Sequence, residues 1–327
     1  MLCVLAFITA FLGVAGWMIP IQLGHSIHED AVVMPATATS VRPWRGYGGV
    51  YDAAGEFDPS SALVRDYGVI VDQPPRCPRA VGQVIDQECI FAGYLIAGHF
   101  GHFLLESCAR LWFAQARPDL PLLWSHGQAL APFNKAVLQI LGIRNPSIFM
   151  TAPARVARLH VPSVGYRIRD GASEAHMRFM GACDEAPMNA TAAGRKVWLS
   201  RAALPRSHGR VVQEPEIVQT LSEHGWIVFE PERHSLVEQL RMLAGAGHVA
   251  GFMGSAFHAL VLLKRFSGKI TLFSRGMANP NFVTIAKARQ FDQSIIDLPL
   301  LAIGGSGSRT EWSLADMSLV HDRLCTA

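Results

Sequence analysis

The stretch from Gly98 to Arg110 carries the residues best suited to proton transfer, in the order Gly-His-Phe-Gly-His-Phe-Leu-Leu-Glu-Ser-Cys-Ala-Arg. His102, Glu106 and Arg110 are four residues apart, so in a helix their side chains lie along one face. A histidine at a strand-to-helix junction, with a carboxylate one turn later to orient its ring, can act as a general base. The same spacing fits a structural ion pair in which Glu106 bridges the other two side chains, and both interpretations stay open.

This stretch also raises the question of a metal site. His99, His102 and Glu106 could supply three ligands, but the metalloprotease pattern needs two histidines at i,i+4 with a glutamate directly after the first. Phe100 and Gly101 follow the first histidine instead. The six cysteines form no C-x-x-C pair, which argues against structural zinc and against a disulfide scaffold. We therefore expect no metal.

Two further groups of residues could hold a phosphate. Gly254 and Ser255 lie in a Gly-rich turn between a predicted strand and a predicted helix, where exposed amides favour an anion, and His258 lies just inside that helix. The second group follows another predicted strand and could clamp a diphosphate through its arginines; it comprises Ser200, Arg201, Arg206 and Arg210. A turn that serves backbone geometry alone and a solvated loop are the respective alternatives.

The elements that must position these groups alternate regularly between strand and helix. After an irregular, β-containing region at 25–88, the pattern predicts strands at 89–96, 120–124, 147–150 and 156–161 and helices at 103–115 and 132–141. In the second half it predicts strands at 196–200, 226–229, 248–250 and 269–273 and helices at 214–224, 235–244, 256–264 and 311–324. Strands joined by helices pair in parallel, so we predict an α/β protein with two Rossmann-like halves facing a cleft.

Composition sets the limits of the function. Half of the residues are apolar and 17% are charged, so the chain can bury a large core. A net charge of +3 without a basic stripe argues against a partner nucleic acid. Residues 1–24 carry no charge and are long enough to span a bilayer, but Gly and Pro interrupt them and no basic residue precedes them. A membrane anchor, a signal peptide and a non-native extension all fit this segment.

Taken in order, the motifs resemble glycosyltransferase family 61, the capsular polysaccharide biosynthesis type. The matching residues are His102, Phe103, Glu106 and Arg110; then Ser200, Arg201, Arg210, Gln213 and Glu214; then Gly225, Trp226, Pro231, Glu232, Leu236, Glu238 and Gln239; and finally Gly251, Gly254 and Ser255. Gln213 stands where the family usually has Asn, and Met253 stands where it usually has His. His258, one helical turn later, is a candidate replacement for the missing histidine.

The resemblance implies a GT-B fold, an inverting mechanism and no required metal or cofactor. We therefore predict a hexosyl- or pentosyltransferase that moves a sugar from a nucleotide-sugar donor to a saccharide or lipid-linked acceptor in surface polysaccharide (capsule) biosynthesis. His102, Glu106 and Arg110 are the expected catalytic residues. The expected donor-binding residues are Ser200, Arg201, Arg206, Arg210, Gly254, Ser255 and His258. The alternatives are a non-catalytic nucleotide-sugar binder, which Met253 suggests, and a metal-dependent hydrolase.

From the sequence and this resemblance we predict five segments: an apolar segment at 1–24, an acceptor-side α/β domain at 25–170, a connection at 171–194, a nucleotide-sugar-binding α/β domain at 195–303, and a hinge with a terminal helix at 304–327. We expect a cytoplasmic protein, with possible membrane contact at the inner face of the membrane through the first segment.

Overall fold

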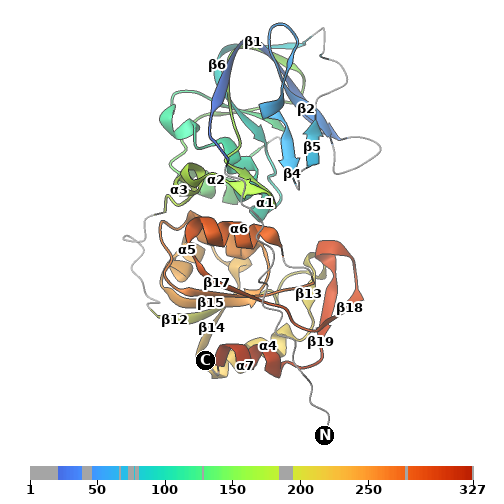
Figure 1. Ribbon diagram of the computed structural model, residues 1–327, viewed down its shortest axis with the longest axis vertical. Coiled ribbons are helices and arrows are strands. Elements are labelled where there is room, and N and C mark those ends of the chain that lie inside the picture. Colours follow the sequence, from blue (N-terminus) through green and yellow to red (C-terminus); the bar gives the residue numbers. More distant parts are fainter. Residues whose placement is uncertain are drawn as a thin grey trace.

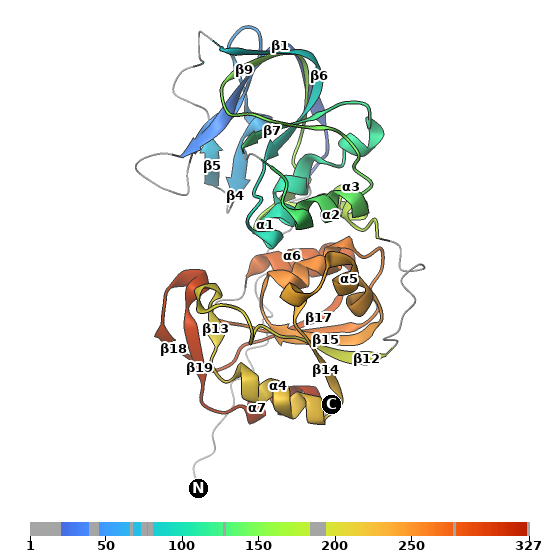
Figure 2. The same cartoon turned by 180° about the vertical axis from the view of Figure 1, so that it is seen from behind.

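The computed structural model describes residues 21–38, 46–65, 68–72, 77, 81–126, 129–183, 194–276 and 279–325. Figures 1 and 2 show a mixed α/β protein whose N-terminal and C-terminal parts are stacked along the long axis, as the alternation of strands and helices predicts for the class. The apolar segment at 1–24 falls outside the described residues except for its last four. Within the described ranges, no helix is both long enough and apolar enough to cross a membrane.

The N-terminal part is built on a nine-stranded mixed sheet in the order β4-β5-β2-β1-β9-β6-β7-β8, with β3 beside β2. The strands are β1 (His25–Ala38), β2 (Gly46–Tyr51), β3 (Phe57–Asp58), β4 (Leu63–Arg65), β5 (Gly68–Asp72), β6 (Gln83–Tyr94), β7 (Leu122–His126), β8 (Ser147–Phe149) and β9 (Ala154–Pro162). Neighbours among β6 to β9 pair in parallel, as predicted. The region at 25–88 is more regular than expected, because β1 pairs antiparallel with β9, more than a hundred residues further along the chain.

Three short helices accompany this sheet: α1 (Phe100–Leu105), α2 (Pro132–Ile140) and α3 (Glu174–Met180), with a small hairpin of β10 (Tyr166–Arg167) and β11 (Gly171–Ala172). The predicted helix at 103–115 is wrong beyond Leu105, where the chain continues as 3-10 turns. The Ser107 hydroxyl accepts from the Ile96 amide and donates to the Tyr94 carbonyl, which ties this segment to the end of β6. Such side-chain bonds to the backbone compete with helix continuation.

The C-terminal part contains a five-stranded parallel sheet in the order β14-β12-β15-β16-β17, made of β14 (Trp226–Phe229), β12 (Arg195–Leu199), β15 (Ala246–Phe252), β16 (Lys269–Phe273) and β17 (Asp292–Ile296). This is the 2-1-3-4-5 order of doubly wound sheets. Helices α5 (Leu236–Ala244) and α6 (Pro280–Arg289) cover the face toward the N-terminal part, and α4 (Glu214–Glu223) and α7 (Ser318–Cys325) cover the other (Figure 1). The capping box of Ser235 and Glu238 is present, as predicted.

Two predicted elements of this part differ from the structure. Residues 311–314 form β19 (Glu311–Leu314), not the first turn of a helix, because they pair with β18 (Leu300–Gly304) and β13 (Arg210–Val211) in a small third sheet. The predicted helix at 256–264 is a 3-10 helix at Ser255–Leu262. At residues 311–314, strand pairing with β13 and β18 outweighs the local helical periodicity.

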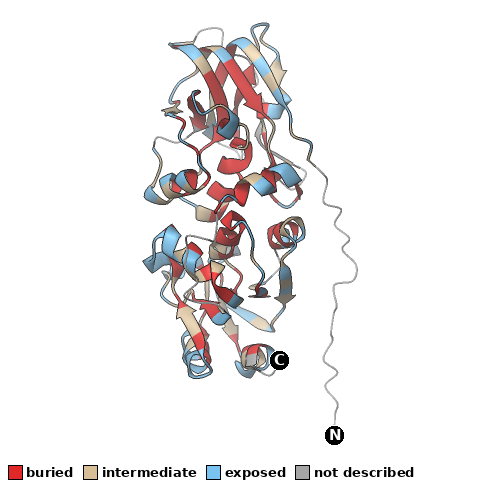
Figure 3. Ribbon diagram, turned by 90° about the vertical axis from the view of Figure 1, so that its left-hand side faces the viewer, coloured by how far each residue is buried: buried red, intermediate tan, exposed pale blue. Residues whose placement is uncertain are grey.

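A single buried apolar cluster runs through the contact between the two parts, which we call the seam; it includes Phe103 of α1 and Leu260 of the 3-10 helix (Figure 3). Asn281 of α6 accepts hydrogen bonds there from the Tyr166 hydroxyl, at 3.1 Å, and from the Arg169 amide, at 2.7 Å. Because apolar packing and buried polar bonds both cross this contact, we expect the two parts to move as one body.

Candidate active site

The predicted base lies on α1, at the seam. His102 Nδ1 is 2.5 Å from Glu106 Oε2, so the ring nitrogen donates to the carboxylate when Glu106 is ionised. The His102 side chain is 34% exposed, whereas that of Glu106 is 3% exposed. This pairing leaves the Nε2 lone pair of His102 to accept a proton.

Arg110 does not join this pair, which corrects the expectation of three side chains along one helical face. The helix ends before Glu106, and Arg110 turns under β6, where its guanidinium donates to the backbone carbonyls of Pro162, Ser60 and Ala62. Burial lowers the pKa of Arg110 to about 10. The alternative of an ion pair from Glu106 to Arg110 is therefore also wrong.

Arg65, at the end of β4, occupies the place that sequence analysis gave to Arg110. Its Nη2 donates to Glu106 Oε2 at 2.6 Å, and its Nε donates to Oε1 of the same carboxylate. Burial alone would raise the pKa of Glu106, but hydrogen bonds from His102 and Arg65, with the charge of Arg65, hold it below its usual range. Sequence reasoning missed Arg65 because nothing in an irregular region, 41 residues away, marks it as a partner of this carboxylate.

A cavity of about 500 Å³ lies beside α1, between the two parts. The N-terminal part contributes Phe100, Pro132, Phe133 and Ala136, and the C-terminal part contributes Leu199, Ser200, Arg201, Leu204, Pro231, Glu232, His234, Ser235, Leu236, Gln239, Phe252, Gly254, Ser255, Ala256 and Phe257. The cavity thus collects four of the predicted donor-binding residues, namely Ser200, Arg201, Gly254 and Ser255. It lies at the carboxyl ends of β12 and β15, where open α/β sheets bind ligands.

Arg201 brings a partly buried cation to this cavity. A Cβ added to Gly254 would lie 2.5 Å from Arg201 Nη1, so the small residue is what lets the guanidinium approach the turn. Arg201 Nη2 donates to the His208 carbonyl at 2.8 Å, and its Nε is buried without a hydrogen-bond partner. Burial lowers the pKa of Arg201, while the charges of Glu214 and Glu232 oppose that shift.

A second arginine, Arg275, follows β16 at the same edge of the sheet and was not predicted; it is partly buried and is not among the cavity-lining residues. Its Nε donates to the Met253 carbonyl at 3.0 Å, next to Gly254. Burial, with the charge of Arg201, lowers the pKa of Arg275 to about 10. Two guanidinium groups near one turn suit a ligand that carries more than one negative charge. The sequence does predict the strand at 269–273, and the position of Arg275 just after that strand could have marked it as a candidate.

The motif residues around Arg201 have structural partners. Glu214 Oε1 accepts from the Arg201 amide at 2.8 Å and from Trp198 Nε1 at 3.1 Å, so this buried carboxylate fixes the backbone that carries the arginine. Burial raises the pKa of Glu214. Gln213 reaches β19 instead, where it donates to Ser313 Oγ at 3.0 Å and accepts from the Leu314 amide at 2.9 Å. Gln213, at the position where the motif usually has Asn, thus holds β19 in place through two hydrogen bonds.

Arg206 and Arg210 do not line the cavity, contrary to the prediction of a three-arginine clamp. Arg210 and Glu311 are opposite each other in the pairing of β13 with β19, and Arg210 Nε lies 3.0 Å from Glu311 Oε1. Arg206 Nε is 3.8 Å from the same carboxylate, with a side chain that is 78% exposed. The register of the small third sheet therefore turns both arginines toward a structural carboxylate.

His258 lies in the seam and is not among the cavity-lining residues. Its ring stacks on Phe282, with centroids 4.7 Å apart, and its Nδ1 is buried without a hydrogen-bond partner. A Cβ on Gly101 would lie only 2.8 Å from His258 Cδ2 and 3.2 Å from Ser255 Cβ. Burial, with the charges of His99 and His102, lowers the pKa of His258 to about 3, so its ring is neutral. The ring packs against α1 at Gly101, beside the wall of the cavity.

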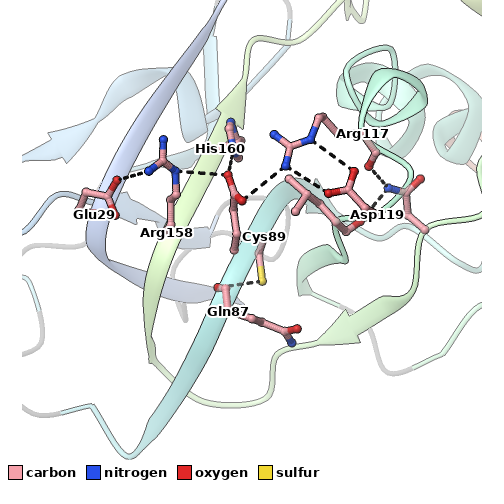
Figure 4. A network of polar contacts seen from close by, with 10 residues as sticks. Glu29, Gln87, Cys89, Arg117, Asp119, Arg158 and His160 are labelled. Carbon is pink, nitrogen blue, oxygen red and sulfur yellow. Dashed lines mark hydrogen bonds and ion pairs between the residues drawn. The ribbon is translucent and has the colours of Figure 1, made fainter.

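A separate polar cluster lies on the N-terminal sheet, where His160, Arg158 and Arg117, labelled in Figure 4, contact Glu88 of β6. Glu88 Oε1 is 2.6 Å from His160 Nε2 and 3.2 Å from Arg158 Nε, and Arg117 lies 3.4 Å from Oε2. None of these residues lines the cavity. Across the part of the chain that the structure describes, no group of three or more His, Cys, Asp or Glu side chains has the geometry to hold a metal, and that includes the group of His99, His102 and Glu106.

Comparison with known families adds to this geometry. The family described as Glycosyltransferase 61 matches residues 100–269, which is more than half of the chain and includes His102, Glu106, Arg201 and Gly254. Arg65 and Arg275 lie outside the matched range. A search of curated proteins found no match. The chain belongs to the glycosyltransferase 61 family.

Proposed function

We propose that this glycosyltransferase binds a nucleoside-diphosphate sugar in the cavity between its two parts and transfers the sugar, with inversion, to a hydroxyl of a saccharide or lipid-linked acceptor. The observation that carries the proposal is Arg201, which lines a cavity of about 500 Å³ together with Gly254 and Ser255, and a second arginine, Arg275, which donates to the Met253 carbonyl next to Gly254. Family membership itself implies glycosyltransferase activity.

In this proposal the donor diphosphate lies against Gly254 and Ser255. Small residues there let phosphate oxygens approach the backbone amides, and the two guanidinium groups stabilise the charge that develops on the leaving diphosphate. The apolar side chains of the cavity, such as Phe252 and Phe257, exclude water and strengthen these contacts.

His102 is the proposed base. The acceptor oxygen attacks the anomeric carbon from the face opposite the diphosphate, the bond from that carbon to the diphosphate oxygen breaks, and the hydroxyl proton moves to His102 Nε2. Glu106 supports this role because it holds Nδ1 as the protonated nitrogen. His102 itself is not among the cavity-lining residues, but Phe100, two residues earlier on α1, lines the cavity, and Gly101 lies against Ser255 of the cavity wall.

A GT-B arrangement, with two α/β halves facing one cleft, is part of the proposal. Its support is the doubly wound strand order of the C-terminal sheet, the parallel run of β8, β7, β6 and β9 in the N-terminal sheet, and a cavity lined from both parts. We also propose a place in surface polysaccharide synthesis at the inner face of the membrane, a location that rests on the uncharged residues 1–24.

The test is donor binding by the purified protein. A panel of UDP-, GDP-, dTDP- and CDP-sugars is screened by thermal shift, and the best ligand is then measured by calorimetry. Arg201→Met and Arg275→Met should each weaken binding by about 10-fold or more, because hydrogen bonds to charged groups contribute roughly 1.5–3 kcal/mol. Arg206→Met is the matched control and should bind like wild type, since Arg206 pairs with Glu311. Wild-type affinity for the nucleotide sugar in both Arg201→Met and Arg275→Met would refute the donor site. Donor binding without turnover would favour a non-catalytic role.

A further inference from the structure

Arg65 is a cation from outside the family-matched region that contacts the carboxylate of the proposed base pair. It ends β4, whose Leu63 is buried in the core of the N-terminal part. Its Nε and Nη2 each donate to one oxygen of Glu106, so the guanidinium grips both oxygens of the carboxylate. With the His102 bond to Oε2, the Glu106 carboxylate receives three hydrogen bonds in a site where it is 3% exposed.

Those contacts decide the charge and the orientation of Glu106. A carboxyl group buried to this extent favours its neutral form unless a cation and hydrogen bonds compensate it. A neutral Glu106 could donate its proton to Nδ1 of His102, which would leave Nε2 protonated and unable to act as a base. An ionised Glu106 accepts from Nδ1–H and leaves Nε2 free.

We propose that Arg65 is a positioning residue of the transfer reaction: it keeps Glu106 as a carboxylate aimed at His102 Nδ1, and its positive charge opposes the addition of a further proton to the His102–Glu106 pair. The inference rests on the proposed function, because it assigns Arg65 a role relative to the base of that reaction. Arg65 acts through Glu106 and not on the substrate.

The charged and titratable groups around the pair come from several elements. Besides Arg65 of β4, His99 caps α1 and packs edge-on against His102, with ring centroids 4.5 Å apart. His258 faces the pair from the 3-10 helix, and Tyr166 faces Glu106 from β10. His258 is neutral above acidic pH, and burial keeps Tyr166 in its phenol form. Arg65 is thus the one permanent cation among the groups named here, so its removal should raise the proton affinity of the pair.

The experiment follows the His102 ring by NMR in the full chain, with histidine labelled with ¹⁵N and ¹³C and the signals assigned by their loss in His102→Gln. Wild type, Arg65→Gln, Arg65→Lys and the control Arg117→Gln are titrated from pH 5 to 8. Arg117 also pairs with carboxylates of the N-terminal part, but those are Glu88 and Asp119.

In wild type the Nδ1–H tautomer is expected near pH 8, and the opposite tautomer would overturn the proposal without any variant. In Arg65→Gln, which keeps a donor but loses the charge, the midpoint of the pair should rise by roughly one pH unit. Arg65→Lys and Arg117→Gln should stay close to wild type. An unshifted midpoint in Arg65→Gln, with the other histidine signals unchanged, would overturn the inference.

This readout needs no substrate, so it separates the inference from the proposed function. An NMR shift as expected, together with full transferase activity of His102→Ala, would refute the base assignment but not the charge effect of Arg65. An inactive His102→Ala with no shift of the midpoint in Arg65→Gln would support the base assignment and refute the charge effect of Arg65. When an active donor is known, Arg65→Gln should lower kcat/KM most at the acidic end of the pH profile, with donor Kd within about two-fold of wild type.

Discussion

Replacing Gly101 by alanine tests the seam that holds the proposed base against the cavity. In an unobstructed helix this change stabilises a protein by about 0.5–1 kcal/mol, because glycine loses more backbone entropy on folding. Here the new Cβ would lie 2.8 Å from His258 Cδ2 and 3.2 Å from Ser255 Cβ. The His258 ring is buried and stacked on Phe282, so it has little room to move aside.

Overpacking of this kind costs about 1–3 kcal/mol, which exceeds the helical gain. We therefore expect Gly101→Ala to lower the free energy of unfolding by roughly 0.5–2 kcal/mol. Urea denaturation followed by circular dichroism measures the change. Gly98→Ala is the matched control, because no atom lies within 4 Å of a Cβ at Gly98, and its stability should change little.

A double-mutant cycle isolates the contact itself. His258→Ala alone should destabilise the protein, because it leaves a cavity beside Phe282. In that background the space near Gly101 is open, so Gly101→Ala should become neutral or stabilising. A stabilising effect of Gly101→Ala in the wild-type background, or the same loss with and without His258, would refute the close packing described for the seam.

Two further predictions concern stability. His176 and His258 are buried with pKa values of about 3, well below an ordinary histidine, so the unfolded state binds more protons than the folded state between about pH 6.5 and pH 3. Stability should therefore fall as pH drops below about 6.5, and His258→Gln should reduce the fall between pH 7 and pH 5 in urea titrations; an equal fall in that variant would contradict the role of His258. Gln213→Ala should lower the free energy of unfolding by about 1–2 kcal/mol because it removes two hydrogen bonds to β19, whereas Ser313→Ala, which removes one, should cost less.

Local signals predicted the C-terminal sheet well. Strands β12, β14 and β16 and helices α4 and α5 lie where periodicity and capping residues place them, since each is encoded by its own segment. Strands β1 and β19 were missed because each pairs with a strand more than a hundred residues away, β1 with β9 and β19 with β13, although β19 also pairs with the nearby β18. No local rule reports such pairing.

In the candidate site, too, the features that depend on local spacing or on parallel strand order were predicted, and those that depend on other tertiary contacts were not. His102 and Glu106 were predicted as a pair because their spacing of four brings them together in one helical turn. Ser200, Arg201, Gly254 and Ser255 meet because parallel strands end at one edge of the sheet. The partners of the arginines were predicted less well: Arg65 and not Arg110 contacts Glu106, and Arg206 and Arg210 lie near Glu311 and do not line the cavity. Ion pairs of this kind depend on tertiary register, which residue spacing does not encode.

The most direct test of the central claim is turnover by a variant that lacks only the proposed base. Release of nucleoside diphosphate from the best-bound nucleotide sugar, with a matching acceptor, is followed by chromatography for wild type and His102→Ala. The account predicts at least a 100-fold loss of kcat in His102→Ala, the usual size of a general-base effect, with donor Kd within a few-fold of wild type. Retention of more than about a tenth of the wild-type rate would contradict it, given that effect size.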